Sequence, residues 1–263
     1  MKPFLHIKTL TFLIICMGSL YANSQTTKQV LILGDSYLKG HFGEFLQKKM
    51  HEAGTYDILS IAIGGAGSKT FTTPMKNLCC GYRVRQSFAS KPLIETKSVW
   101  GSKVPVLESA EAVTNGWVMK SQEGSLENVL NFWKPQAVIL VLGANWINAH
   151  EDLLKIFFAC NDSIPLIWIG PFEKNTSAGR YTLINKAIKN KPNCFLVRSD
   201  LIVEKMGIPA AHFFGTTAKK LAENIFEKFR PFLETELKNM DKKAASANKY
   251  ISKNLWLQVI RGY

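Results

Sequence analysis

Residues 29–40, QVLILGDSYLKG, hold the turn around which the rest of the chain is organised. The apolar run over residues 30–33 is too short for a globular helix, so it predicts a strand buried on both faces. Apolar side chains recur at helical spacing after Ser36, which predicts a helix that begins at this serine. Ser36 is then expected at a strand-to-helix turn, where backbone N–H groups point at whatever its hydroxyl attacks. An ordinary turn with a capping serine is the alternative interpretation.

Strand and helix patterns alternate along the rest of the chain. Such alternation specifies a parallel sheet that helices cover on both faces, so the sequence predicts an α/β fold with a five-stranded parallel sheet. The four strands that follow the first are expected at residues 56–63, 136–142, 165–169 and 194–198. The helices between and after them are expected at residues 125–133, 151–160, 178–189 and 215–232.

Four short motifs lie at the ends of these elements. GDS at residues 34–36 follows the first strand, GGAGS at 64–68 the second and GAN at 143–145 the third, while HFFG at 212–215 precedes the last helix. In this order they resemble the four blocks of the SGNH, or GDSL-type, esterases and lipases, which supply Ser, Gly, Asn and His. The resemblance covers about residues 29–229 and implies a flavodoxin-like three-layer α/β/α sandwich.

The resemblance also implies a role for each motif. Ser36 would attack an ester carbonyl, and His212 would take the serine proton and return it to the leaving alcohol. The backbone N–H groups of Ser36 and Gly65, with the Asn145 side chain, would hold the oxyanion. Taken alone, Gly65 could be a turn glycine and His212 a surface or capping residue. This chemistry needs no cofactor, and no cysteine or histidine spacing typical of a zinc site is present.

Two positions depart from the family pattern. The family usually places an aspartate three residues before its histidine, and that position is Pro209 here. A third group is expected to orient the histidine, and Asp200, which follows the fifth strand, is the nearest carboxylate in sequence, with Glu204 a weaker candidate. The usual aspartate after Asn145 is replaced by Trp146, which alters the neighbouring surface.

The N-terminal residues 1–24 have the pattern of a secretory signal peptide. Their apolar stretch, residues 10–20, is shorter than the ~20 residues of a spanning helix, so we expect no stable membrane anchor and a periplasmic or secreted protein. The predicted organisation after the signal peptide is an SGNH hydrolase-like domain at residues 25–232, with an insertion at 69–124, and a basic tail at 233–263. The tail is either a helix packed back on the domain or a loose segment.

Basic residues dominate the chain, whose formal net charge is +13. Such charge suits anionic polymers or lipid head groups, and no recognised nucleic-acid module is present. Residues 69–103 carry seven Lys or Arg against the single Glu95, with aromatic residues between them and no helix or strand period. We expect this segment to cover the active site and bind acidic sugars, or else to be a solvated loop. Reversing Arg83 and Arg85 to Glu should weaken glycan binding and leave folding intact.

Four cysteines follow the predicted signal peptide. Cys160, at a helix end, and Cys194, at a strand start, are expected on the sheet edge opposite Ser36 and should pair with each other. Cys79 and Cys80 would form an adjacent bridge or remain free.

The sequence therefore predicts an exported serine esterase or O-acyltransferase. Its substrate would be a small ester or an acylated glycan, above all the O-acetyl groups of a cell-wall or extracellular polysaccharide. Hydrolysis and transfer differ only in whether water or a sugar hydroxyl reaches the acyl-enzyme. The alternative is a polysaccharide-binding protein that kept the fold and lost turnover, which the Pro209 departure favours. The sequence predicts no oligomeric state.

Overall fold

The computed structural model describes residues 27–73, 80–93, 97–101, 125–145, 148–209 and 212–260, so the predicted signal peptide lies outside the described residues. The strands are β1 (Lys28–Gly34), β2 (Tyr56–Ile63), β3 (Tyr82–Ser87), β4 (Lys97–Gly101), β5 (Ala137–Val141), β6 (Leu166–Ile169) and β7 (Cys194–Val197). The helices are α2 (Ser36–Lys39), α3 (His41–Glu52), the 3-10 turn η1 (Ser68–Phe71), α5 (Leu126–Trp133), α6 (His150–Cys160), α7 (Lys174–Ile188), α8 (Ser199–Lys205) and α9 (Gly215–Ile260).

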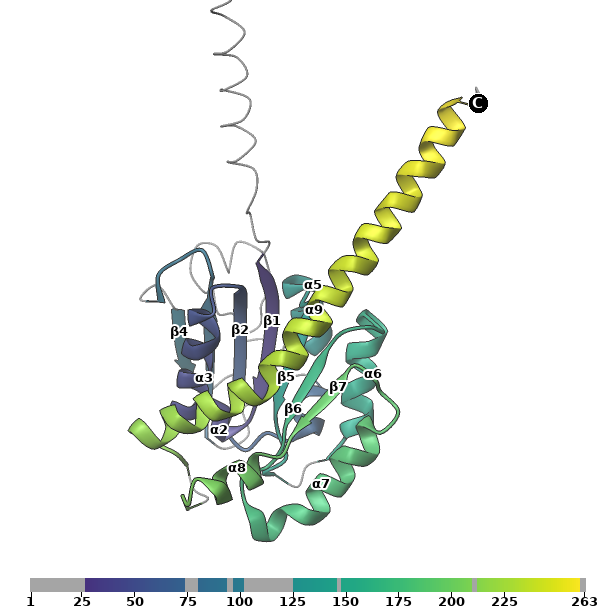
Figure 1. Ribbon diagram of the computed structural model, residues 1–263. Helices are drawn as coiled ribbons and strands as arrows, with labels where there is room; N and C mark the ends of the chain where they lie inside the picture. Colours follow the sequence, from purple (N-terminus) through teal and green to yellow (C-terminus); the bar gives the residue numbers. More distant parts are fainter. Residues whose placement is uncertain are drawn as a thin grey trace, which may run out of the picture.

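One mixed sheet forms the centre of the molecule, in the order β4-β3-β2-β1-β5-β6-β7 (Figure 1). The five predicted strands are all present and pair in parallel, as β2-β1-β5-β6-β7. That order is the order of flavodoxin-like sheets. The predicted count of five strands is wrong, because β3 and β4 extend the sheet beyond β2 in antiparallel pairing.

Alternate residues of β1 face two separate cores. Val30 and Ile32 pack with residues of α3 and α9, whereas Leu31 and Leu33 pack with residues of α5 and α6. All four side chains are fully buried, and burying each one contributes about 1.5–3 kcal/mol. Helices therefore cover both faces of the sheet, as the alternating pattern predicts.

The last helix is longer than predicted. α9 starts at Gly215, as expected, but passes through Pro231 and continues to Ile260, so the boundary at residue 232 is wrong. The buried stripe of the helix continues beyond residue 232 with Leu233 and Leu237. The Lys28 ammonium lies 2.6 Å from an Asp241 oxygen, which ties this part of α9 to the start of β1. Figure 1 shows the final turns of α9 extending past the sheet.

The predicted bridge between Cys160 and Cys194 is wrong, because both cysteines are free. Cys160 is exposed at the last residue of α6, and Cys194 is partly buried at the first residue of β7, where burial raises the pKa of its thiol to about 12. Two cysteines on the same sheet edge do not necessarily pair, since a disulfide requires Cα atoms within about 7 Å and converging side chains. Cys80 is disulfide-bonded. Cys79 lies outside the described residues, so the adjacent bridge stays a prediction.

Candidate active site

Ser36 lies at the turn between β1 and α2, as predicted, and is partly buried. Gly34 allows this turn because a Cβ there would lie 2.6 Å from the Leu38 Cβ and 2.9 Å from the Val141 carbonyl oxygen. The residue that caps α2 is Asp35, whose carboxylate accepts the Tyr37 N–H at 2.9 Å. The alternative interpretation of Ser36 as a capping serine is therefore wrong, and its hydroxyl is not used in the cap.

The two loops that carry Gly65 and Asn145 are joined to each other. Gly65 follows β2 with a φ of +80°, a left-handed conformation that favours glycine. The Asn145 side chain, after β5, donates one Nδ2–H to the Ala66 carbonyl at 2.8 Å. An amide carries two such hydrogens, so the second can serve a ligand. The Ser68 hydroxyl also links the segments that follow β2 and β5, because it accepts the Ala149 N–H at 2.6 Å.

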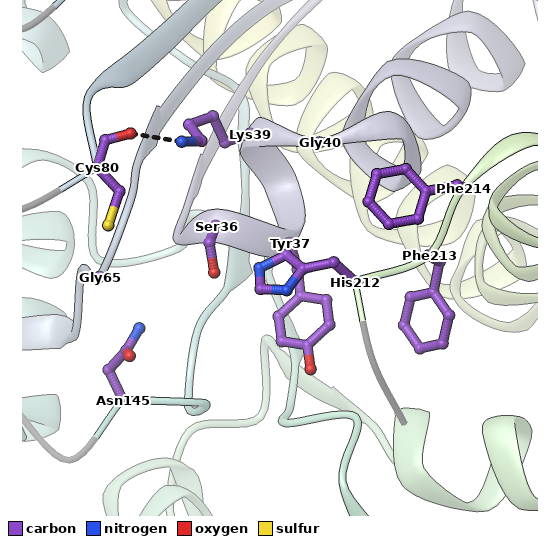
Figure 2. A pocket seen from close by; sticks show the side chains of 10 residues that line it. All are labelled: Ser36, Tyr37, Lys39, Gly40, Gly65, Cys80, Asn145, His212, Phe213 and Phe214. Atoms are coloured by element: carbon purple, nitrogen blue, oxygen red, sulfur yellow. Dashed lines mark hydrogen bonds between the residues drawn. The ribbon is translucent and has the colours of Figure 1, made fainter. Parts of the chain in front are cut away.

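The structure brings Ser36, Gly65, Asn145 and His212 into the lining of one pocket of about 520 Å³. Figure 2 shows the Ser36 side chain between Asn145 on one side and His212 on the other. The remaining lining residues are Tyr37, Lys39, Gly40, Cys80, Phe213 and Phe214. A pocket that combines a hydroxyl, an imidazole and amide donors has the groups that acyl transfer requires.

Asp200 does not line this pocket. Its carboxylate accepts two hydrogen bonds from the Arg198 guanidinium, at 2.9 and 2.6 Å, and is itself buried. Burial raises the pKa of the Asp200 carboxyl, but the Arg198 and Tyr181 hydrogen bonds outweigh that effect and the net shift is downward. The structure therefore does not support the expectation that Asp200 orients His212.

The motifs did not indicate Tyr37, a buried residue that lies next to His212, or Glu173, the partly buried residue that Tyr37 binds. The imidazole stacks on the Tyr37 ring, with centroids 5.1 Å apart and planes at 11°. The Tyr37 hydroxyl donates to Glu173 at 2.5 Å, and the second Glu173 oxygen lies 3.8 Å from Arg180. Glu173 comes shortly after β6, on the sheet edge that carries Ser36, which is the one sequence signal that could have indicated it.

Burial also changes the protonation of Asp35. Its side chain is 1% exposed, and this burial, with the nearby Glu173 charge, raises the pKa of the Asp35 carboxyl to about 7. Hydrogen bonds from the Tyr37 and Ala144 backbone act in the opposite direction but do not cancel the effect. Asp35, the residue before Ser36, is therefore protonated below neutral pH.

The insertion supports the site through strand β3. Arg85 of β3 is 2% exposed, and its guanidinium donates to the carbonyls of Leu38, Lys39 and Gly40 at 2.9, 2.7 and 3.0 Å. The expected surface role of Arg85 is therefore wrong, and Arg85→Glu would place a carboxylate against three carbonyl oxygens.

Two other residues of the insertion have contacts near the site. Arg83 pairs with Glu44 at 3.0 Å. Of the described part of the insertion, Cys80 lines the pocket and its carbonyl accepts the Lys39 ammonium (Figure 2).

The described residues contain neither a metal-binding cluster nor a candidate membrane-spanning helix. They contain no group of three or more His, Cys, Asp or Glu side chains arranged to hold a metal ion. None of the helices in the described ranges combines the length and the apolar character needed to cross a bilayer.

Comparison with known proteins shows no family membership. No protein-family model matches the chain, and no curated protein does. Among solved structures the chain is similar to an acetyl xylan esterase, Est2A, from the rumen bacterium Butyrivibrio proteoclasticus. The two sequences are 15% identical, the match covers 78% of this chain and 65% of that chain, and the TM-score is 0.38. It is also similar to a DUF4886 family protein from Bacteroides uniformis, with 13% identity, 70% and 65% coverage and a TM-score of 0.33. This chain thus spans about 65% of the length of each. Likeness this distant carries no argument about activity.

Proposed function

We propose that the protein is an exported SGNH-type serine esterase or O-acyltransferase that uses Ser36 as its nucleophile. One observation carries the proposal: Ser36, Gly65, Asn145 and His212 come from four separate segments and line the same pocket. Two of these side chains supply a nucleophile and a base, and the other two residues supply N–H donors. Such a set is what nucleophilic acyl transfer requires.

In the proposed reaction the Ser36 oxygen attacks the ester carbonyl carbon while His212 takes the hydroxyl proton. The oxyanion that forms accepts hydrogen bonds from the Ser36 and Gly65 N–H groups and from the free Nδ2–H of Asn145. The tetrahedral intermediate collapses, the ester C–O bond breaks, and the leaving alcohol receives the proton from His212. Water or a sugar hydroxyl then attacks the acyl-enzyme by the same steps and frees Ser36.

The substrate we propose is an O-acetylated extracellular or cell-wall polysaccharide. The predicted signal peptide and the formal charge of +13 support an exported protein that meets anionic polymers. The pocket rim supports sugar binding, because Phe214 is 65% exposed there and Lys39 lines the same pocket. Exposed aromatic rings offer a flat apolar face to a sugar, and an ammonium attracts carboxylates.

A non-catalytic polysaccharide-binding protein is the second candidate. It is favoured by a specific observation: the carboxylate expected to orient His212, Asp200, is bound to Arg198 instead. In this case the pocket would bind glycan without turning over esters.

Ester hydrolysis by the purified mature protein tests the two candidates. We expect release of 4-nitrophenol from 4-nitrophenyl acetate, and acetate from acetylated glycans, with loss of at least about a hundredfold in Ser36→Ala and His212→Ala. Ser246→Ala, on the exposed surface of α9, is the matched control and should keep wild-type rates. Glycan retention without any ester turnover would replace the esterase by the binding protein.

A further inference from the structure

The His212 imidazole has an aromatic ring stacked on its face, whereas a triad carboxylate would accept the imidazole N–H in the plane of the ring. A serine–histidine pair works best when a third group fixes the imidazole and stabilises the imidazolium that forms. Here the described neighbour in direct ring contact is Tyr37, which lies parallel to the imidazole at 5.1 Å and 11°. Figure 2 shows the two rings against each other at the side of the pocket that holds Ser36.

The Tyr37 ring is itself held in place from three directions. Phe172 packs against it with centroids 4.5 Å apart, and Phe213 with centroids 5.8 Å apart. The Tyr37 hydroxyl donates to Glu173 at 2.5 Å, the length of a strong charge-assisted hydrogen bond. Arg180, 3.8 Å from the other Glu173 oxygen, fixes the carboxylate in turn. The plane on which His212 rests is therefore set by a partly buried hydrogen bond to a residue that follows a separate strand.

We propose that Tyr37, anchored by Glu173, is the positioning residue that replaces the triad acid: it sets the plane of the His212 ring and stabilises its imidazolium form. The proposal rests on the esterase function proposed above. A tyrosine face attracts a cation through the ring quadrupole, and a hydrogen bond from its hydroxyl to a carboxylate makes the ring more electron-rich. Because His212 is cationic only after it takes the Ser36 proton, this attraction acts mainly in the transition state.

The charged groups around Tyr37 also favour a positive charge on His212. Glu173 and Asp35 are the acidic groups that act on the Tyr37 hydroxyl, and Arg180 is the opposing cation. Burial first, and then Glu173, raise the pKa of the Tyr37 phenol, so its proton stays on Tyr37 throughout. The proton that moves is therefore the Ser36 proton alone, which passes to His212 and on to the leaving alcohol.

Three substitutions separate the parts of this arrangement. Tyr37→Phe keeps the stacked ring and removes the hydroxyl, Tyr37→Leu removes the ring, and Glu173→Gln keeps an acceptor but removes the charge. Tyr181→Phe is the matched control, because Tyr181 is also buried and donates its hydroxyl to the Pro171 carbonyl at 2.9 Å. It removes a buried phenol of the same kind without touching His212.

We expect Tyr37→Phe and Glu173→Gln to lower kcat about tenfold with KM unchanged, and Tyr37→Leu to lower it about a hundredfold. The acidic limb of the kcat/KM profile should move to lower pH in all three, because the imidazolium is less stabilised. Tyr181→Phe should change neither. If Tyr37→Phe and Glu173→Gln match Tyr181→Phe in kcat and pH profile, the proposal is wrong, whatever their effect on stability.

A second readout needs no turnover and so separates this proposal from the esterase function. Diethyl pyrocarbonate modifies neutral imidazole, and peptide mass spectrometry measures its rate at each histidine. At slightly acidic pH we expect His212 to react several-fold faster in Tyr37→Leu and Glu173→Gln than in wild type, with His41 as the internal reference. Equal His212 rates in all variants would overturn the proposal even if wild type hydrolyses esters. Faster modification of His212 in these variants, without ester turnover by wild type, would support the stacking of His212 on Tyr37 and refute the proposed esterase function.

Discussion

At the scale of single residues, Asp35 links the site to the stability of the fold. Its folded pKa is raised to about 7 from the model-peptide value of 3.8, mainly by burial. Between these values the folded protein holds a proton that the unfolded chain releases. The free energy of unfolding should therefore fall as pH rises from about 4 to 7, by an amount on the order of a few kcal/mol, and level off above.

Asp35→Asn should flatten this dependence. Asparagine is an equally good cap, so its oxygen can still accept the Tyr37 N–H, but it carries no charge at any pH. We expect the melting temperature of wild type to fall between about pH 4 and 7 and that of Asp35→Asn to change less. The control is Asp152→Asn, since Asp152 is exposed and paired with Lys155 on α6. Parallel pH curves for wild type and Asp35→Asn would show that Asp35 is not protonated in the fold.

Arg85 gives a second prediction at this scale. Its three hydrogen bonds to the carbonyls that follow Ser36 make it a clamp on the turn between α2 and α3. Arg85→Ala should lower the free energy of unfolding by about 2–5 kcal/mol, because hydrogen bonds from a buried charge are lost together. Urea denaturation measures the change.

Arg83→Ala is the neighbouring control for that measurement. Arg83 forms an ion pair with the half-exposed Glu44, and such pairs are typically worth about 0–1 kcal/mol. If both arginine variants lose the same small amount of stability, Arg85 does not clamp the turn. Its burial also lowers the pKa of the Arg85 guanidinium to about 9, the direction expected when a charge leaves water.

At the scale of elements, periodicity identified those strands and helices that have an apolar face. β1, β2 and β5–β7 were predictable because each is a short apolar run buried between helix layers. β3 was not, because its buried positions include Arg85, Gln86 and Ser87, whose polar side chains hide the alternation of a strand. The sequence motifs likewise located Ser36 and His212, each beside an element boundary.

The group beneath His212 could not be predicted in the same way. The position of Asp200 directly after a predicted strand favours it as the orienting group, yet its carboxylate accepts hydrogen bonds from the nearby Arg198. Glu173 also follows a strand, but its contact with Tyr37 depends on how α2 packs against the segment after β6. Distance along the chain does not reveal such a contact between side chains.

The length of α9 leads to a prediction about truncation. Removing residues 233–263 should destabilise the protein by about 3–6 kcal/mol, because two buried leucines, Leu233 and Leu237, are lost with the Asp241 ion pair. Removing only residues 247–263 keeps these contacts and should shift the melting temperature little. Thermal denaturation of both truncations against the full chain tests this, and equal losses would mean that the anchoring part of α9 lies after residue 246.

At the scale of the whole molecule, the sheet order explains why the site forms where it does. Ser36, Gly65, Asn145 and Glu173 follow the carboxyl ends of β1, β2, β5 and β6, which are neighbours in the sheet. The chain passes from β1 to β2 on one side and then to β5 on the other. In open α/β sheets the crevice at such a reversal is where ligands bind. The antiparallel extension by β3 and β4 adds Arg85, whose guanidinium donates to the Leu38 carbonyl in α2.

The most direct test of the central claim is covalent capture of the nucleophile. The mature protein is incubated with a fluorophosphonate, which forms a stable adduct with an activated serine, and the adduct is located by peptide mass spectrometry. We expect one adduct, on Ser36, that is absent from Ser36→Ala and forms at least about tenfold more slowly in His212→Ala. A folded wild-type protein that takes no label, or that is labelled at a serine outside this pocket, would contradict it.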